Sequence, residues 1–126
     1  RLAVVRMPEI FREKDPRGFI VFCEQKQWEQ HIINESGHEI MNDNIQAVRE
    51  TIRKPDYIYE SHNSTEERRR EMYFKFSSGA TYYPRFQTLV VSELHGGSAE
   101  VITTYPVPTG KYGGTKGEAI YNADDK

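Results

Sequence analysis

The sequence predicts an α+β domain, with helices packed on one face of an antiparallel sheet. Two segments in the first half of the chain carry apolar residues at helical spacing. Four β-rich segments follow them, and short turn-like stretches join these four. Helices followed by a run of strands with short connections are typical of this fold class. The length of 126 residues suits one domain with a substantial core.

The first half of the chain is expected to contain a buried strand and two helices. Trp28 and Ile32 lie four residues apart, which places them on one face of a first helix. Ile45, Val48 and Ile52 recur at helical spacing in a second helix, which a proline closes. The expected elements are a short strand compatible with 1–7, a loop with two prolines up to residue 17, a buried strand at 18–24, and helices at 25–35 and 42–56.

The second half of the chain is expected to be β. In one of its strands, Met72, Phe74 and Phe76 alternate with Tyr73 and Lys75, so the two sets face opposite sides of the sheet. A tight turn, HGGS, joins the last two strands in a hairpin. The predicted strands cover 56–61, 71–77, 85–94 and 99–107.

Charge and cysteine content exclude several classes of protein. Lys and Arg total 17 against 19 Asp and Glu, a net charge of −2, so the chain lacks a general positive surface for nucleic acid. Any contact with nucleic acid would need a local basic patch. The single cysteine, Cys23, cannot form an internal disulfide, and its apolar surroundings predict core packing in a reducing, cytoplasmic compartment. No apolar run approaches the roughly 18 residues that span a bilayer.

Four histidines are candidates for proton transfer, because imidazole titrates near neutral pH. His31 follows Trp28 by three residues and shares its helix face. It is therefore either a half-buried residue beside the core or a proton carrier. His38, His62 and His95 fall in loops or turns and are expected to be solvated.

Two motifs for metal or phosphate binding are incomplete. His38 and Glu39 begin an H-E-x-x-H motif, but Asn42 occupies the position of the second zinc ligand. Gly110 and Lys111 lack both the earlier glycine and the following Ser or Thr of a phosphate-binding loop. We therefore expect neither a metal nor a cofactor.

The outer face of the sheet, away from the helices, offers a second set of candidates. Tyrosine, lysine and threonine side chains alternate there with other residues along three predicted strands. Such a surface can stack bases and hold phosphate oxygens, but Tyr–Thr cross-strand pairs are also common in sheets. Both interpretations stay open. The residues concerned are Tyr57 and Tyr59, Tyr73 and Lys75, and Thr103 and Tyr105.

Two arginine features are equally ambiguous. The run Arg68–Arg70 is flanked by glutamates, so it is either a solvated charged segment or an edge that attracts phosphate. Arg85 begins a predicted strand, where a guanidinium can hold a phosphate with two hydrogen bonds or pair with a carboxylate.

Five segments occur in order between Phe19 and Val107: WEQHIINESGHEIM, IQAVRETIRKPDYIYES, MYFKF, LVVSEL and AEVITTYPV. In order and spacing they resemble the phage and mobile-element branch of the barnase–EndoU–colicin–RelE-like nucleases. The resemblance implies two helices packed on one face of a four-stranded antiparallel sheet. It also implies metal-independent RNA cleavage, in which a base activates the ribose 2′-OH, an acid protonates the leaving 5′-oxygen, and a 2′,3′-cyclic phosphate results.

The same resemblance divides the chain and assigns roles. It implies an N-terminal extension at 1–18, a nuclease domain at 19–107 and a Gly-rich polar tail at 108–126, which we expect to be loosely held. The implied catalytic residues are His31, Thr103 and Tyr105, and the implied substrate-binding residues are Tyr73 and Lys75, to which the spacing adds Arg85.

The chain departs from the family after the first helix. NESGHEIM occupies the place of an RHPE-like segment, so the role of His38 stays open. The resemblance implies an RNA substrate, an immunity or antitoxin partner, and a role as a phage or mobile-element toxin. The alternative is a non-catalytic module of the same fold that binds protein or RNA, which the slightly acidic net charge favours.

Overall fold

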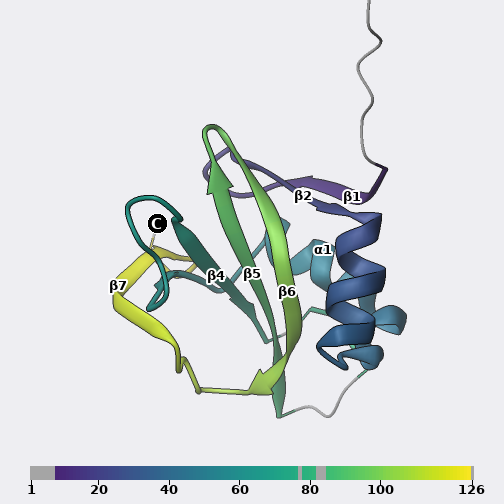
Figure 1. Ribbon diagram of the computed structural model, residues 1–126. Coiled ribbons are helices and arrows are strands. Elements are labelled where there is room, and N and C mark those ends of the chain that lie inside the picture. The colour runs from purple at the N-terminus through teal and green to yellow at the C-terminus, as the bar shows by residue number, and fades with distance from the viewer. Residues whose placement is uncertain (1–7, 77, 82–84, 126) are drawn as a thin grey trace, which may run out of the picture.

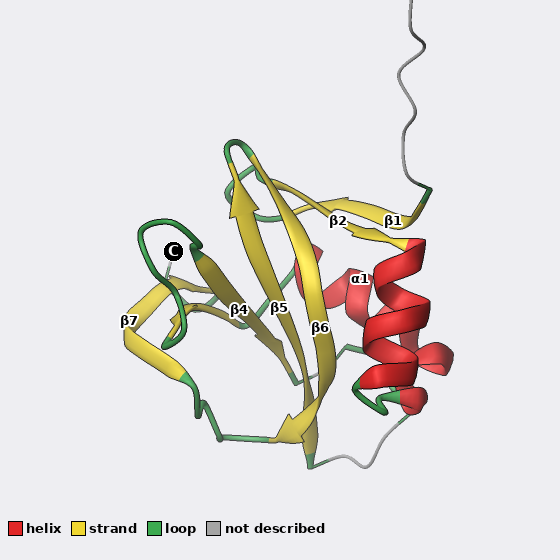
Figure 2. Ribbon diagram, in the orientation of Figure 1, coloured by secondary structure: helices red, strands yellow, loops and turns green. Residues whose placement is uncertain are grey.

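A computed structural model describes residues 8–76, 78–81 and 85–125, which form a seven-stranded sheet with helices on one side (Figure 1, Figure 2). The elements are β1 (Glu9–Lys14), β2 (Ile20–Glu24), η1 (Gln27–Glu35), η2 (Glu39–Asn44), α1 (Ile45–Arg53), β3 (Tyr57–Ser61), β4 (Arg70–Lys75), β5 (Phe86–His95), β6 (Ser98–Pro108) and β7 (Thr115–Asn122). The short strand suggested at 1–7 lies outside the described residues.

The sheet is larger than the sequence predicts, and it is mixed. Its order is β1-β2-β6-β5-β4-β3-β7, and its neighbours are antiparallel except for β2 and β6, which run parallel. The four strands predicted in the second half are β3 to β6, at the middle of the sheet. The fold class of two helices on a four-stranded antiparallel sheet is nevertheless wrong, because β1, β2 and β7 extend the sheet on both sides.

Strand β1 replaces a predicted loop. Phe11 is buried against Trp28, with the ring centroids 6.3 Å apart. Glu13 is only 8% exposed, because its carboxylate pairs with Arg49 and lies 3.1 Å from the Arg53 guanidinium. Strand β1 carries four charged residues in six, a pattern that indicates a loop. Burial of Glu13 becomes favourable only because Arg49 and Arg53, which are distant in sequence, pair with it.

The turn between β1 and β2 is tied to the central sheet by a network of charged groups. Arg17 Nη2 lies 2.6 Å from Asp15 Oδ2 and 2.6 Å from Glu71 Oε1 on β4. The Tyr73 hydroxyl donates to the same Asp15 oxygen at 2.7 Å. All the acceptors in this network are buried, so the hairpin and β4 are held together by matched charges.

The C-terminal segment, which was expected to be loosely held, contains strand β7. This strand pairs antiparallel with β3, with Ile58 opposite Tyr121 and Ser61 opposite Thr115. All of its residues are partly or fully exposed. An edge strand has one neighbour and can manage with few buried apolar side chains, so its sequence resembles a polar tail.

The helical segments begin and end close to the predicted places. Segment η1 has π-helical hydrogen bonding, in which Ser36 N donates to His31 O at 2.9 Å. The second predicted helix consists of the 3₁₀ turn η2 followed by α1, and it ends before Pro55. No helix in the described part of the chain is long and apolar enough to cross a membrane.

Apolar side chains form one cluster on each face of the sheet. The cluster beneath the helices contains Phe11, Val21, Cys23, Trp28, Ile32, Met41, Val48, Ile52, Ile58, Tyr73, Val90, Ala99 and Val101. The outer cluster contains Met72, Phe74, Leu89 and Val91, covered by Tyr59, Tyr105, Val107 and Tyr112. Cys23 packs in the core as predicted, and burial raises the pKa of its thiol to about 12.

The two faces of β4 are the reverse of the prediction. Tyr73 belongs to the cluster beneath the helices, whereas Met72 and Phe74 belong to the outer cluster. The hydrogen bonds of the Tyr73 hydroxyl with Asp15 and Arg17 make its full burial favourable. Tyr73 therefore does not lie on the outer face.

Candidate functional site

A pocket of about 190 Å³ opens on the outer face of the sheet. Its walls come from the end of β3 and the turn after it, from β4, β5 and β6, and from the glycines that precede β7. The lining residues are Ser61, His62, Asn63, Arg70, Met72, Val91, Ile102, Thr103, Tyr105, Gly113 and Gly114. Histidine, arginine, tyrosine and threonine side chains thus meet in one concave site.

A bulge in β6 directs the predicted pair Thr103 and Tyr105 towards this pocket. Thr103 lies opposite Val91, but Val101 lies opposite the next residue of β5, so Ile102 is an extra residue in the ladder. Val101 then faces the core beneath the helices, while Thr103 and Tyr105 face outward. The carbonyl oxygen of Ile102 accepts a hydrogen bond from Gln27 on η1, at 2.7 Å.

His38 lies directly against this pair. Its Nδ1 is 3.3 Å from the Thr103 hydroxyl, and its ring centroid is 4.8 Å from that of Tyr105. Burial lowers the pKa of His38 from its ordinary value, although a backbone hydrogen bond with Thr104 acts in the opposite direction. His38 is therefore mainly neutral near pH 7, the form that can accept a proton.

His62 lies among the residues that line the pocket. Its Nδ1 is 2.7 Å from the carbonyl oxygen of Gly114, so Nδ1 carries a proton and Nε2 is the nitrogen left for chemistry. Gly114 has a φ of +83°, and a Cβ there would lie 3.4 Å from the imidazole. Glycine thus lets the loop approach His62 in a backbone conformation that other residues rarely adopt.

Arg70 supplies the cation of the pocket. Its Nε donates to Glu93 at 3.0 Å, which fixes the guanidinium at the wall. Arg69 and Lys116 lie at the same end of the sheet, within 3.6 and 3.8 Å of the Glu60 carboxylate. Each of these cations is therefore paired with a carboxylate, so the β3–β4 end of the sheet carries matched charges rather than an excess of positive charge.

The structure brings together some of the predicted site residues and separates others. Thr103 and Tyr105 lie side by side, but the histidine that contacts them is His38 rather than His31. His31 lies on η1 with a half-exposed side chain, and its Nδ1 is 3.0 Å from Glu35 on the same helix. Arg85 is exposed at the start of β5, where its carbonyl oxygen accepts from Thr109 N.

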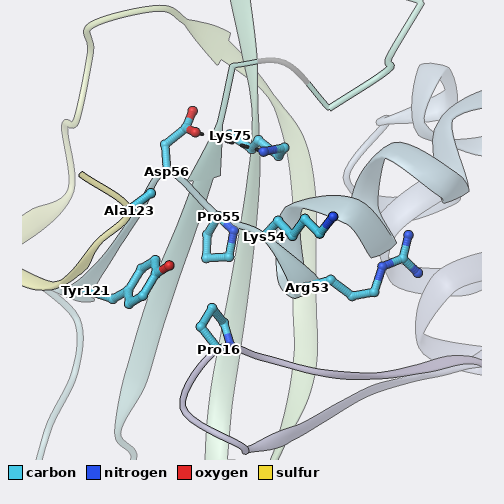
Figure 3. Close-up of a pocket in the computed structure, with 8 residues that line it drawn as sticks. All are labelled: Pro16, Arg53, Lys54, Pro55, Asp56, Lys75, Tyr121 and Ala123. Atoms are coloured by element: carbon cyan, nitrogen blue, oxygen red, sulfur yellow. Dashed lines mark ion pairs between the residues drawn. The ribbon is translucent and has the colours of Figure 1, made fainter. Parts of the chain in front are cut away.

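Lys75 lines a second pocket, of about 330 Å³, shown in Figure 3. Its ammonium nitrogen lies 3.9 Å from the Asp56 carboxylate. The other lining residues are Pro16, Arg53, Lys54, Pro55, Tyr121 and Ala123. None of these eight lining residues is a histidine or cysteine, so this pocket is less suited to proton transfer near pH 7 than the first.

The sequence analysis expected His62 to be solvated and gave Gly114 no role, yet both line the pocket. They are 52 positions apart, and nothing in the local pattern pairs them. The paired glycines at 113 and 114 are the signal that a close backbone approach was needed. Among the described residues, no group of three or more His, Cys, Asp or Glu side chains is arranged to hold a metal ion.

Comparison of the chain with protein-family models, with curated proteins and with solved structures found no match. The resemblance to the nuclease family therefore depends on the sequence segments quoted above. The chemistry of the site has to be argued from its own side chains.

Proposed function

We propose that the chain is a metal-independent endoribonuclease whose active site is the outer-face pocket. The observation that carries the proposal is that Thr103 and Tyr105 line the pocket with His62 and Arg70 and also contact His38, which is not itself one of the lining residues. Two imidazoles beside a cation and two hydroxyls are the groups that cleavage through the ribose 2′-OH requires.

In the proposed reaction His38 is the base and His62 is the acid. One ring nitrogen of His38 keeps its proton in the hydrogen bonds with the Thr103 hydroxyl or the Thr104 backbone, and the lone pair of the other nitrogen takes the 2′-OH proton. The 2′-oxygen then forms a bond to the adjacent phosphorus, and the bond from phosphorus to the 5′-oxygen breaks. Protonated His62 gives its Nε2 proton to that 5′-oxygen. The products are a 2′,3′-cyclic phosphate and a 5′-hydroxyl, and the two histidines have exchanged protonation states.

Arg70 and Tyr105 would stabilise the charge that develops on the phosphate. A guanidinium held by Glu93 is fixed before substrate arrives, so it needs no reorganisation during the reaction. The Tyr105 hydroxyl, on β6, can add a second hydrogen bond. Both residues line the pocket.

The proposal extends to the setting of the protein. Its substrate would be cellular RNA in the cytoplasm, where a single buried cysteine is suited to reducing conditions. The resemblance further implies a toxin or effector of a phage or mobile element, controlled by an immunity or antitoxin protein, and the proposal includes both.

The test is cleavage of a labelled RNA oligonucleotide by the purified protein in the presence of EDTA. We expect a 2′,3′-cyclic end, and no cleavage at a position where the ribose is replaced by 2′-deoxyribose. His38→Ala and His62→Ala should each lower kcat by about 100- to 10,000-fold, whereas the matched control His31→Ala should cleave like the wild type.

Each variant should first be shown by circular dichroism to be folded. Loss of activity in His31→Ala alone would contradict the site and support the assignment from resemblance. Binding of RNA by the wild type without any cleavage would instead support the second candidate, a non-catalytic RNA-binding module, which the net charge of −2 does not exclude.

A further inference from the structure

Three tyrosines form a continuous aromatic surface next to the candidate active site. The ring centroids of Tyr57, Tyr59 and Tyr112 are 5.4 to 5.9 Å apart in each pair. Tyr59 and Tyr112 also contact the buried ring of Phe74, at 6.0 and 5.0 Å. All three tyrosines remain partly exposed, so their rings are held in place from below and reachable from solvent. We call this set the tyrosine platform.

The tyrosine platform and the pocket rest on the same apolar side chains. Met72 and Val91 line the pocket and also belong to the outer cluster that Tyr59 and Tyr112 cover. Along β3, Tyr57 and Tyr59 precede His62, which is three residues beyond Tyr59. At about 3.3 Å per residue, that spacing is about 10 Å, roughly the reach of one or two nucleotides.

The loop that carries Tyr112 also holds His62. The amide of Gln87 donates to the carbonyl oxygens of Pro108 and Lys111, at 3.3 and 3.1 Å, and Thr115 donates to Tyr112 O at 2.7 Å. Two residues after Tyr112, the Gly114 carbonyl accepts from His62. A ligand that rests on Tyr112 is therefore positioned relative to the proposed acid.

Rings of this kind recognise unpaired bases. Base–aromatic stacking needs an exposed face of the base, which a duplex does not offer, and it tolerates any sequence. Lys111 precedes Tyr112 and is exposed to solvent, whereas the ammonium group of Lys116 on the same segment lies 3.8 Å from Glu60 and donates to Ser64 O at 3.0 Å. Positive charge beside stacking rings suits a polyanion with bases better than it suits an apolar peptide.

We propose that the tyrosine platform binds bases of single-stranded RNA that lie one or two nucleotides beyond those flanking the cleaved bond, so that the enzyme prefers unpaired RNA longer than a dinucleotide. This inference rests on the proposed function, because it places the platform beside the proposed active site.

The test uses an octanucleotide in which every ribose is 2′-O-methylated, so that it cannot be cleaved. Fluorescence anisotropy should show that Tyr112→Leu and Tyr57→Leu weaken its binding by about 10- to 100-fold. Tyr112→Trp should bind at least as well as the wild type, since the ring is kept. The matched control is Phe22→Leu, a half-buried aromatic residue on β2, which should bind unchanged. The same oligonucleotide in a duplex should bind poorly.

A second readout separates this inference from the nuclease proposal. Tyr112→Leu should raise KM for an octanucleotide but not for a dinucleoside monophosphate, which is too short to reach the platform. Cleavage of both substrates at wild-type efficiency by Tyr112→Leu would overturn the platform and leave the nuclease intact. Tyrosine-dependent binding without cleavage would overturn the nuclease and support the platform. Equal binding of duplex and single strand would also overturn the platform.

Discussion

Partial burial beside Tyr105 gives His38 a pH dependence that can be measured. Its pKa is lowered from the ordinary value because burial disfavours the imidazolium form. In the unfolded chain the pKa returns to about 6.5. Between these two values the unfolded chain binds a proton that the folded chain does not. The contribution of His38 to stability is therefore complete above about pH 6.5, is lost as the pH falls below it, and changes no further below the folded pKa.

We expect the Cε1–H resonance of His38 to titrate with a midpoint below about 6.5. The resonance can be assigned by its loss in His38→Ala. If His38 is the base, kcat/KM should fall on the acid side with the same midpoint. A midpoint at or above the ordinary value would contradict both the burial argument and the role of His38 as a neutral base.

At this scale the sequence predicted part of the candidate site. Alternation along the strand placed Thr103 and Tyr105 on one face, the resemblance gave them their roles, and the structure brings them together at a pocket. The resemblance assigned His31 and left the role of His38 open. The contact of His38 with β6 could not be predicted, because it depends on the path of the chain after η1. Tyr73 was misassigned because its partners, Asp15 and Arg17, lie in a turn that no periodicity marks.

Among the elements, the β1–β2 hairpin depends on one arginine. Arg17 neutralises both Asp15 and Glu71, and both carboxylates are buried. We expect Arg17→Ala to lower the free energy of unfolding by about 3 kcal/mol, because it leaves two buried carboxylates without their cation. Urea denaturation measures this change.

The matched control is Arg12→Ala on the same hairpin. Arg12 pairs with Glu9 at 2.6 Å, but on the surface, so its removal should change the stability little. Equal midpoints for Arg17→Ala and the wild type would mean that the buried network does not hold the hairpin to β4.

The strands that the sequence predicts correctly are those that are buried because of their own apolar side chains, without help from residues elsewhere in the chain. Strands β3, β4 and β5 lie between two neighbours for most of their length, whereas β6 pairs with β5 throughout and with β2 only at Ser98–Glu100. The β-branched and aromatic residues of these four strands are buried on at least one face. Strand β1 needs Arg49 and Arg53 to bury Glu13, and all residues of β7 are partly or fully exposed. The sequence therefore predicts the middle of the sheet better than its edges.

Across the whole molecule, the last strand connects stability with the candidate site. A chain that ends at Val107 would lose the pairing of β7 with β3, the ring of Tyr112 and the carbonyl of Gly114. Tyr57 and Tyr59 would then be exposed beside an open strand edge. We expect this truncation to lower Tm by at least about 10 °C, which corresponds to about 2 kcal/mol or more at this chain length.

A truncation after Ala123 is the matched control, because it keeps all of β7 and the hydrogen bond from Ala123 N to Asp56 O, at 2.9 Å. It should melt like the full chain.

In the full chain, Gly114→Ala should lower activity more than it lowers Tm, because the strain at a φ of +83° displaces the carbonyl that orients His62. If the chain ending at Val107 melts and cleaves RNA like the full one, the domain limits of 19–107 suggested by the resemblance are sufficient, and β7 is a dispensable edge. If it unfolds early, the Gly-rich segment is part of the fold and of the site that it completes.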